Sequence, residues 1–152
     1  MLDKQREKEG KILVIHGSNL DMLGRKDPSL YGDVTLEEIN REITHTAEAC
    51  GMSADTFQSN HEQELVKKIY EASDGYDVLI INPAAYTHTG MAIREALLVL
   101  DIPIIEVHLS NIYRQEPSRQ KSLVADVVTA QLAGFGKEGY TMAVRAAADM
   151  VA

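Results

Sequence analysis

The chain has 152 residues, 45% hydrophobic and 25% charged, a composition ordinary for one soluble globular domain. Its formal net charge of −8 argues against a general nucleic-acid-binding protein, which needs a basic surface. The single cysteine excludes an intrachain disulfide framework and is typical of a reducing compartment, and no apolar run reaches the ~20 residues of a membrane span. We therefore expect a cytoplasmic protein with neither nucleic-acid nor membrane partners.

Residues 1–10 are charged and contain no apolar stretch, so they do not form a signal peptide, and we expect a mobile tail. We expect residues 11–152 to form a single domain. It begins with a buried strand over residues 11–16, which ends at Gly17.

A long irregular segment, residues 17–32, follows this strand. A loop of that length in a compact domain is usually functional and often a lid. It carries Asn19, Arg25, Lys26 and Tyr31, and its glycine spacing matches neither nucleotide-phosphate motif. A tyrosine at a loop end is more often a packing residue than a catalyst, and from the residues alone both remain open for Tyr31.

The next segments alternate helix and strand. The first helix opens at Thr35 and stops at Gly51, with one apolar face made of Leu36, Ile39, Ile43, Ala47 and Cys50. Thr35 with Glu38 predicts a capping box, and we interpret Cys50 as a core residue. A weaker strand over residues 52–58 precedes a second helix. There Ser59 and Glu62 suggest another capping box, and the core face is made of Leu65, Val66, Ile69 and Tyr70.

Two further strands end in polar residues. The strand over residues 77–82 ends at Asn82, and His88 lies just before a helix predicted over residues 89–100, whose amino terminus favours anions. A short strand over residues 102–105 is followed immediately by Glu106, Val107 and His108. Glu106 and His108 share one face of the strand, where a carboxylate can fix the imidazole tautomer; solvated polar side chains at a strand end are the alternative.

The remaining segments complete the pattern. A polar stretch over residues 111–122 precedes a fifth strand, predicted over residues 127–135. The last helix is predicted over residues 137–151, with Met142, Ala146 and Met150 on one face. Because strands and helices alternate and crossovers are right-handed, we predict a three-layer α/β sandwich with a five-stranded parallel sheet, which resembles flavodoxin. In such sheets ligands bind at the carboxyl ends of the strands.

From residue 11 to the last helix the chain resembles the type II 3-dehydroquinate dehydratases. The motifs that carry the resemblance are Gly17-Ser18-Asn19-Leu20, Tyr31-Gly32, residues 57–62, Ile81-Asn82-Pro83, residues 86–89, residues 105–111 and Gly139-Tyr140. The resemblance implies a hydro-lyase without cofactor or metal, which removes water from the small molecule 3-dehydroquinate by anti-elimination through an enolate. It also implies trimers assembled into a dodecamer.

The resemblance also implies roles for individual residues. Tyr31 corresponds to the base, His108 to the general acid oriented by Glu106, and Asn19 to a residue that holds a water at the enolate oxygen. Lys26 occupies the position of the cation that favours the tyrosinate. The residues implied in substrate binding are Asn82, His88, Leu109, Ser110 and Arg119, with Glu95 reaching the site of a neighbouring subunit.

Several positions depart from the family pattern. Lys26 and Gln115 replace arginines, Glu95 replaces an aspartate, and His16 and Ser18 replace the usual Asn and Pro. Lysine supplies charge without the planar fork of arginine. His16 is either a satisfied histidine at a strand end or a new substrate contact. Two alternative functions therefore stay open: dehydration of a related keto-polyol acid, or ligand binding without catalysis. Aromatic amino-acid biosynthesis through shikimate and chorismate, and quinate breakdown, also both remain possible.

Overall fold

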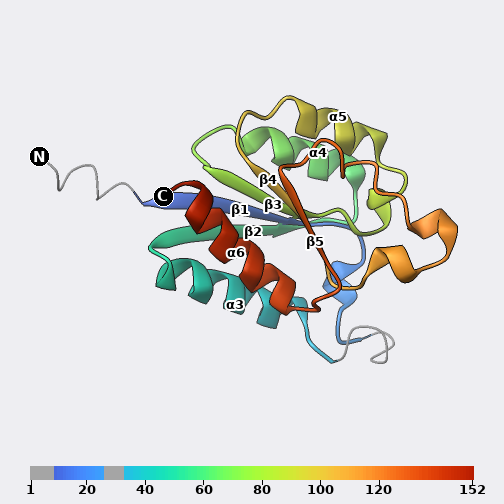
Figure 1. Cartoon of the computed structure of the whole chain (residues 1–152), viewed down its shortest axis with the longest axis horizontal. Coiled ribbons are helices and arrows are strands. Elements are labelled where there is room, and N and C mark those ends of the chain that lie inside the picture. The colour runs from blue at the N-terminus through green and yellow to red at the C-terminus, as the bar shows by residue number, and fades with distance from the viewer. Residues whose placement is uncertain (1–8, 26–32) are drawn as a thin grey trace, which may run out of the picture.

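A computed structural model describes residues 9–25 and 33–152, so residues 1–8 of the tail expected at residues 1–10, and Lys26 and Tyr31, lie outside the described residues. The predicted end of that tail is wrong, because Gly10 is the first residue of a strand. The described part contains a five-stranded sheet in the order β2-β1-β3-β4-β5, with every pair parallel (Figure 1). The strands are β1 (Gly10–His16), β2 (Met52–Gln58), β3 (Val78–Asn82), β4 (Ile104–His108) and β5 (Ala130–Ala133).

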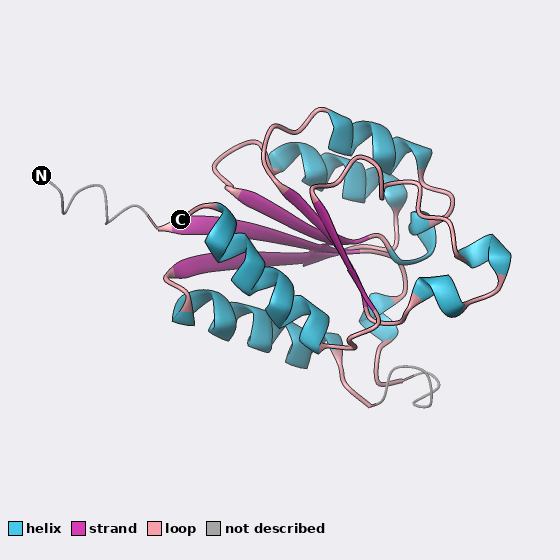
Figure 2. Cartoon of the chain, viewed as in Figure 1, coloured by secondary structure: helices cyan, strands magenta, loops and turns pink. Residues whose placement is uncertain are grey.

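Helices cover both faces of the sheet. Helices α3 (Leu36–Ala49) and α6 (Glu138–Met150) pack together on one face, and α4 (Glu62–Glu71) and α5 (Met91–Leu98) on the other (Figures 1 and 2). Each layer buries its own core cluster, because successive strand side chains point to opposite faces. The predicted three-layer, flavodoxin-like class is therefore confirmed. Within the described ranges, none of these helices combines the length and apolar character of a membrane span.

Short helical turns follow the carboxyl ends of three strands. They are η1 (Leu20–Met22) after β1, η2 (Ala84–Thr87) after β3, and η3 (Ile112–Arg114) and η4 (Pro117–Arg119) after β4. Because the strands are parallel, these turns gather at one edge of the sheet. The strand order reverses between β1 and β3, and this switch point lies under the same edge.

Two strand predictions had the wrong bounds. The apolar stretch predicted as a strand over residues 127–135 pairs with β4 only over Ala130–Ala133. Val127 lies in a turn, where its N–H donates to the carbonyl of Val124, and Gly134 leaves the strand with a φ of 95°. β4 begins at Ile104 and continues through His108, so Glu106 and His108 lie inside the strand and not beyond it.

Helix caps and faces were predicted in part. Thr35 Oγ1 accepts the N–H of Glu38, which confirms the first cap. The second capping box is wrong, because the Ser59 hydroxyl accepts the N–H of His61 and donates to Glu64. Cys50 is only partly buried, at the end of α3.

The buried faces of α4 and α6 also differ from the prediction. Tyr70 of α4 is 52% exposed, and Met142 and Met150 of α6 lie on the outside. The buried face of α6 is made of Tyr140, Ala143, Val144 and Ala147. Helix α6 is apolar on more than one side, so periodicity alone does not select the face that meets the sheet.

Gly17 generates the first prediction. Its N–H donates to the carbonyl of Asn82 at 2.7 Å, and a Cβ added there would lie 2.3 Å from the carbonyl oxygen of Pro83. We expect Gly17→Ala to separate these two loops and lower the free energy of unfolding by about 1–3 kcal/mol, measured by urea denaturation. Gly139→Ala is the control, because a Cβ added there would lie 3.5 Å from its nearest neighbour, Val107 Cγ1, and we expect no loss of stability. Equal stability of the two variants would contradict the close-packing argument.

Candidate active site

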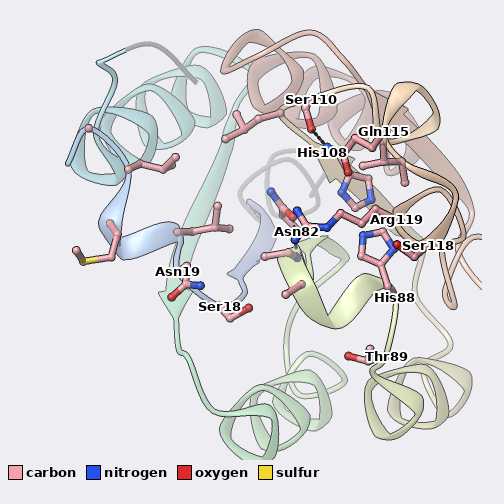
Figure 3. Close-up of a pocket in the computed structure, with 18 residues that line it drawn as sticks. Ser18, Asn19, Asn82, His88, Thr89, His108, Ser110, Gln115, Ser118 and Arg119 are labelled. Carbon is pink, nitrogen blue, oxygen red and sulfur yellow. Dashed lines mark hydrogen bonds between the residues drawn. The ribbon is translucent and has the colours of Figure 1, made fainter. Parts of the chain in front are cut away.

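A cavity of about 610 Å³ opens at the carboxyl ends of β1, β3 and β4 (Figure 3). Seven of the residues predicted for the site line it: Asn19, Asn82, His88, His108, Leu109, Ser110 and Arg119. In the view of Figure 3, His88 and His108 lie on the side of Arg119, and Ser18 and Asn19 lie opposite. The sheet topology thus brings together residues from distant parts of the sequence.

Glu106 and His108 form a buried pair. Glu106 is 0% and His108 5% exposed, so the alternative of solvated side chains at a strand end is wrong. His108 Nε2 lies 2.5 Å from Glu106 Oε2, which also accepts the Ser122 hydroxyl at 2.8 Å, and Gln131 Nε2 donates to Glu106 Oε1 at 3.2 Å. A proton on Nε2 faces the carboxylate, which leaves Nδ1 as the ring nitrogen that can exchange a proton with a ligand.

Asn82 is held from two sides at the end of β3. Its Oδ1 accepts the N–H of Ala84 at 3.0 Å, and its Nδ2 donates to the hydroxyl of Tyr140 at 3.1 Å. Ala84 has a φ of 56°, in the left-handed region that a residue with a Cβ seldom adopts. The amide is 3% exposed and therefore depends on these partners for its orientation.

His88 and Asn19 enter the cavity from loops that are tied to other segments. His88 Nδ1 lies 2.8 Å from the carbonyl of Lys121. A carbonyl only accepts, so Nδ1 carries the proton, and Nε2 of the neutral ring can accept from a ligand hydroxyl. Asn19 has a φ of 66°, and its backbone N–H donates to Asn60 Oδ1 at 2.7 Å. That bond ties the exit of β1 to the exit of β2.

Gln115 acts directly on a predicted site residue. Its Nε2 donates to the Ser110 hydroxyl at 3.0 Å (Figure 3). Its backbone carbonyl accepts from Gln120 Nε2 at 2.7 Å. In the sequence Gln115 stands out only as a lost cation, yet its amide lines the cavity and donates to the hydroxyl of Ser110. Thr89 and Ser118 also line the cavity; Thr89 belongs to the motif of residues 86–89 but was given no role, and no sequence motif included Ser118.

His16 lies behind the cavity in a network of buried polar groups. It is 0% exposed, with Nδ1 3.3 Å from the Tyr140 hydroxyl and Nε2 2.8 Å from Asn40 Oδ1. His16 is not among the described residues that line the cavity. Of the two interpretations, the structure therefore favours a hydrogen-bonded histidine at a strand end over a new substrate contact. Burial lowers the pKa of His16 to about 4, against a smaller opposing effect of the hydrogen bond to Asn40.

Four predicted site residues are not placed in the cavity. Glu106 lies behind the His108 ring, and Glu95 lies exposed on α5, both outside the described lining. Lys26 and Tyr31 fall in the segment that the structure does not describe. Gly24, two positions before Lys26, does line the cavity.

Comparison with known proteins gives consistent matches. The family described as "Dehydroquinase class II" matches residues 10–148. A 3-dehydroquinate dehydratase of Roseiflexus castenholzii is 53% identical over 134 residues, which are 88% of this chain and 85% of the relative. The crystal structure of a type II dehydroquinase from Propionibacterium acnes has a TM-score of 0.89 at 35% identity and covers 93% of this chain and 99% of its own. One from Butyrivibrio crossotus has a TM-score of 0.89 at 39% identity, covering 91% and 97%.

The pKa of His16 predicts acid sensitivity. An unfolded histidine titrates near 6.5 and the folded one near 4, so between these values the unfolded state binds more protons. We expect the contribution of His16 to the free energy of unfolding to be complete above pH 6.5 and to fall by roughly 3 kcal/mol as the pH drops to 4. Denaturation at several pH values compares the chain with His16→Gln, which cannot titrate. If the free energies of unfolding of the wild-type chain and His16→Gln differed by the same amount at every pH, this explanation of the acid sensitivity would be wrong.

Proposed function

This chain belongs to the class II dehydroquinase family and is a 3-dehydroquinate dehydratase, a hydro-lyase, and we propose that residues 11–152 carry out the reaction as one catalytic domain. The substrate site is the cavity at the ends of β1, β3 and β4. The observation that carries this assignment is the buried pair of Glu106 and His108, which presents one imidazole nitrogen for proton transfer in a cavity also lined by amide, hydroxyl and guanidinium groups.

The first step removes a proton from C2 of the substrate, beside the C3 ketone. We assign Tyr31 as the base in its tyrosinate form. Because an unperturbed tyrosine has a pKa of ~10, a nearby cation must favour the anion, and we assign that role to Lys26. The electron pair moves onto the ketone oxygen to form an enolate, and a water held by Asn19 stabilises it. A base and an enolate stabiliser in one water-excluded pocket are what this chemistry needs.

The second step expels the C1 hydroxyl, which His108 protonates so that it leaves as water. The Glu106 carboxylate faces Nε2 of His108. It stabilises the positive charge of the protonated ring until His108 gives up its proton. Ser122 and Gln131 satisfy the remaining acceptor positions of this buried carboxylate, so it stays in one orientation. Collapse of the enolate gives the conjugated enone 3-dehydroshikimate.

The other predicted residues bind the substrate. Ser110, with the backbone N–H groups of Leu109 and Ser110, binds the carboxylate at the end of β4. Asn82, His88 and Arg119 bind the ring hydroxyls and the carboxylate. The hydrogen-bond partners of His88 support this, because its Nε2 is left as an acceptor. Gln115 donates to the Ser110 hydroxyl from a neutral amide, where the family pattern has a charged guanidinium.

We further propose that the protein works as trimers assembled into a dodecamer in the cytoplasm, with Glu95 reaching the site of a neighbour. One face of α5 supports this, because Met91, Glu95 and Leu98 lie on it at helical spacing, and Met91 and Leu98 are 55% and 59% exposed. Sedimentation velocity measures the assembly. Both aromatic amino-acid biosynthesis and quinate breakdown use this reaction, and genetic loss of the protein distinguishes them by the supplement that restores growth.

Turnover of 3-dehydroquinate tests the function. We expect the purified protein to produce the ultraviolet absorbance of the conjugated enone, and Tyr31→Phe to abolish it while the fold is retained, because phenylalanine cannot accept the C2 proton. Tyr70→Phe is the control, since Tyr70 is half exposed on α4, and its turnover should be unchanged. Undiminished turnover in Tyr31→Phe would refute the role of this residue.

A flat trace from correctly folded wild-type protein would contradict the assignment of the substrate. Lys26→Arg and Gln115→Arg would then be combined, and restored activity would show that these departures had changed the pocket. Screening related keto-polyol acids would test the first alternative function, and calorimetric binding without product would indicate the second.

Glu106 generates a separate prediction. In Glu106→Gln the neutral amide cannot stabilise an imidazolium, so we expect kcat to fall on the order of 100-fold. KM should change little, because Glu106 lies outside the described cavity lining. Steady-state kinetics measures both, and Glu71→Gln, on the exposed surface of α4, is the control. A rise in KM at unchanged kcat would show that Glu106 acts in binding and not in proton transfer.

A further inference from the structure

We propose that Tyr140, His16 and Asn40 form a hydrogen-bond chain of fixed direction that orients the Asn82 amide toward the substrate, so that Tyr140 and His16 are positioning residues. The inference rests on the proposed function, because it takes Asn82 as a substrate-binding residue. The chain links the end of β3 to α6, β1 and α3 through groups that lie behind the cavity.

The direction of the chain at the Asn82 end follows from one backbone group. The N–H of Ala84 can only donate, so the atom of Asn82 that faces it at 3.0 Å is Oδ1. Nδ2 of Asn82 must then face the Tyr140 hydroxyl, and it donates to that oxygen at 3.1 Å. Rotating the amide by 180° would place the NH₂ group against the Ala84 N–H, where two donors would meet.

The other end of the chain is set by Asn40. Its Oδ1 only accepts, so neutral His16 carries its proton on Nε2, which donates to that oxygen at 2.8 Å. His16 Nδ1 is then an acceptor, and the Tyr140 hydroxyl, 3.3 Å away, donates to it while accepting from Asn82. The three hydrogen bonds that link Asn82, Tyr140, His16 and Asn40 therefore all run in the same direction, from Asn82 toward Asn40.

Because these groups are buried, a change in the direction of their hydrogen bonds would cost free energy. Asn82, Tyr140 and His16 are 3%, 1% and 0% exposed, and in such surroundings a misdirected donor costs more than in water. Burial also raises the pKa of the Tyr140 hydroxyl and lowers that of His16, so both groups remain neutral over the usual pH range. A neutral tyrosine and a neutral imidazole can each donate once and accept once, as the chain requires.

The geometry also defines what Asn82 offers the substrate. With one N–H given to Tyr140 and one lone pair given to Ala84, the amide keeps one N–H and one lone pair for the cavity that it lines. Removing the Tyr140 hydroxyl releases the Nδ2 end, and the amide can then rotate away from the productive pose.

A double-mutant cycle on turnover of 3-dehydroquinate tests the proposal. We expect Tyr140→Phe to lower kcat/KM about tenfold, mainly through KM, because a buried donor loses its acceptor. In the background of Asn82→Ala the same change should have almost no further effect. The same factor in both backgrounds, or no loss in the wild-type background, would overturn the proposal. Tyr76→Phe is the matched control, because it also removes a hydroxyl hydrogen bond, to Asp55, away from the cavity, and its kcat/KM should not change.

A second pair of variants covers the case in which Tyr140→Phe does not fold. Glutamine at position 16 keeps one acceptor and one donor, and leucine keeps neither. We expect His16→Gln to stay within about threefold of the wild-type kcat/KM and His16→Leu to lose about tenfold. Equal activities of the two variants would overturn the proposal.

A measurement independent of activity separates this proposal from the function on which it rests. In protein with ¹⁵N-labelled histidine, NMR reports which ring nitrogen of His16 carries the proton. The Nε2–H form supports the chain, and the Nδ1–H form overturns it, whether or not 3-dehydroquinate is turned over. Absence of turnover in the wild type together with the Nε2–H form would refute the substrate and leave the orientation of Asn82 intact.

Discussion

The cost of burying the Glu106 carboxylate constrains how the chain is arranged at the carboxyl ends of the strands. A fully buried charge is tolerated only when its acceptor positions are filled. Here the donors come from three segments: His108 on β4 itself, Ser122 in the connection that follows, and Gln131 on β5. β5 must therefore pair with β4 in the observed register, which places Gln131 beside Glu106. The same bonds that satisfy the carboxylate also hold the edge strand in place.

A comparable constraint operates at the switch point of the sheet. Gly17 lets the loop after β1 approach the loop after β3, and Ala84 accepts a left-handed φ so that its N–H faces Asn82. These two local features bring the exits of neighbouring strands together. The cavity is therefore built by backbone geometry first, and its side chains are held by partners behind it.

Much of this could be predicted from the sequence. The alternation of strands and helices gives the class of the fold, and the helix carrying Ile39, Ile43 and Ala47 shows one clear apolar face. The resemblance identified residues such as His108 and Ser110, which the structure places at one cavity. The end of β4 was less accessible, because a strand that carries buried polar residues looks like a loop until their partners are known. The strand β5 was predicted too long, because apolar residues on both sides of Ala130–Ala133 lie outside the sheet.

The supporting residues could not be predicted in this way. Tyr140 and Gln131 act through contacts across 58 and 25 positions of the sequence, and no local pattern encodes such distances. Helix α6 was assigned the wrong inner face because alanines occur on several of its sides, so that the docking partner decides which side is buried. Gln115 illustrates a third limit, since its effect on Ser110 depends on the path of the intervening turns.

Helix α6 and strand β5 are the last elements in chain order, yet they supply the partners of Asn82 and Glu106. A ribosome synthesises β1, β3 and β4 well before it adds these segments. Until they emerge, the nascent chain carries a carboxylate and an amide without those buried partners, so the edge of the sheet that lines the cavity cannot reach its final order before these segments have been made. A fragment that stops before residue 130 keeps Glu106 and Asn82 but lacks both partners.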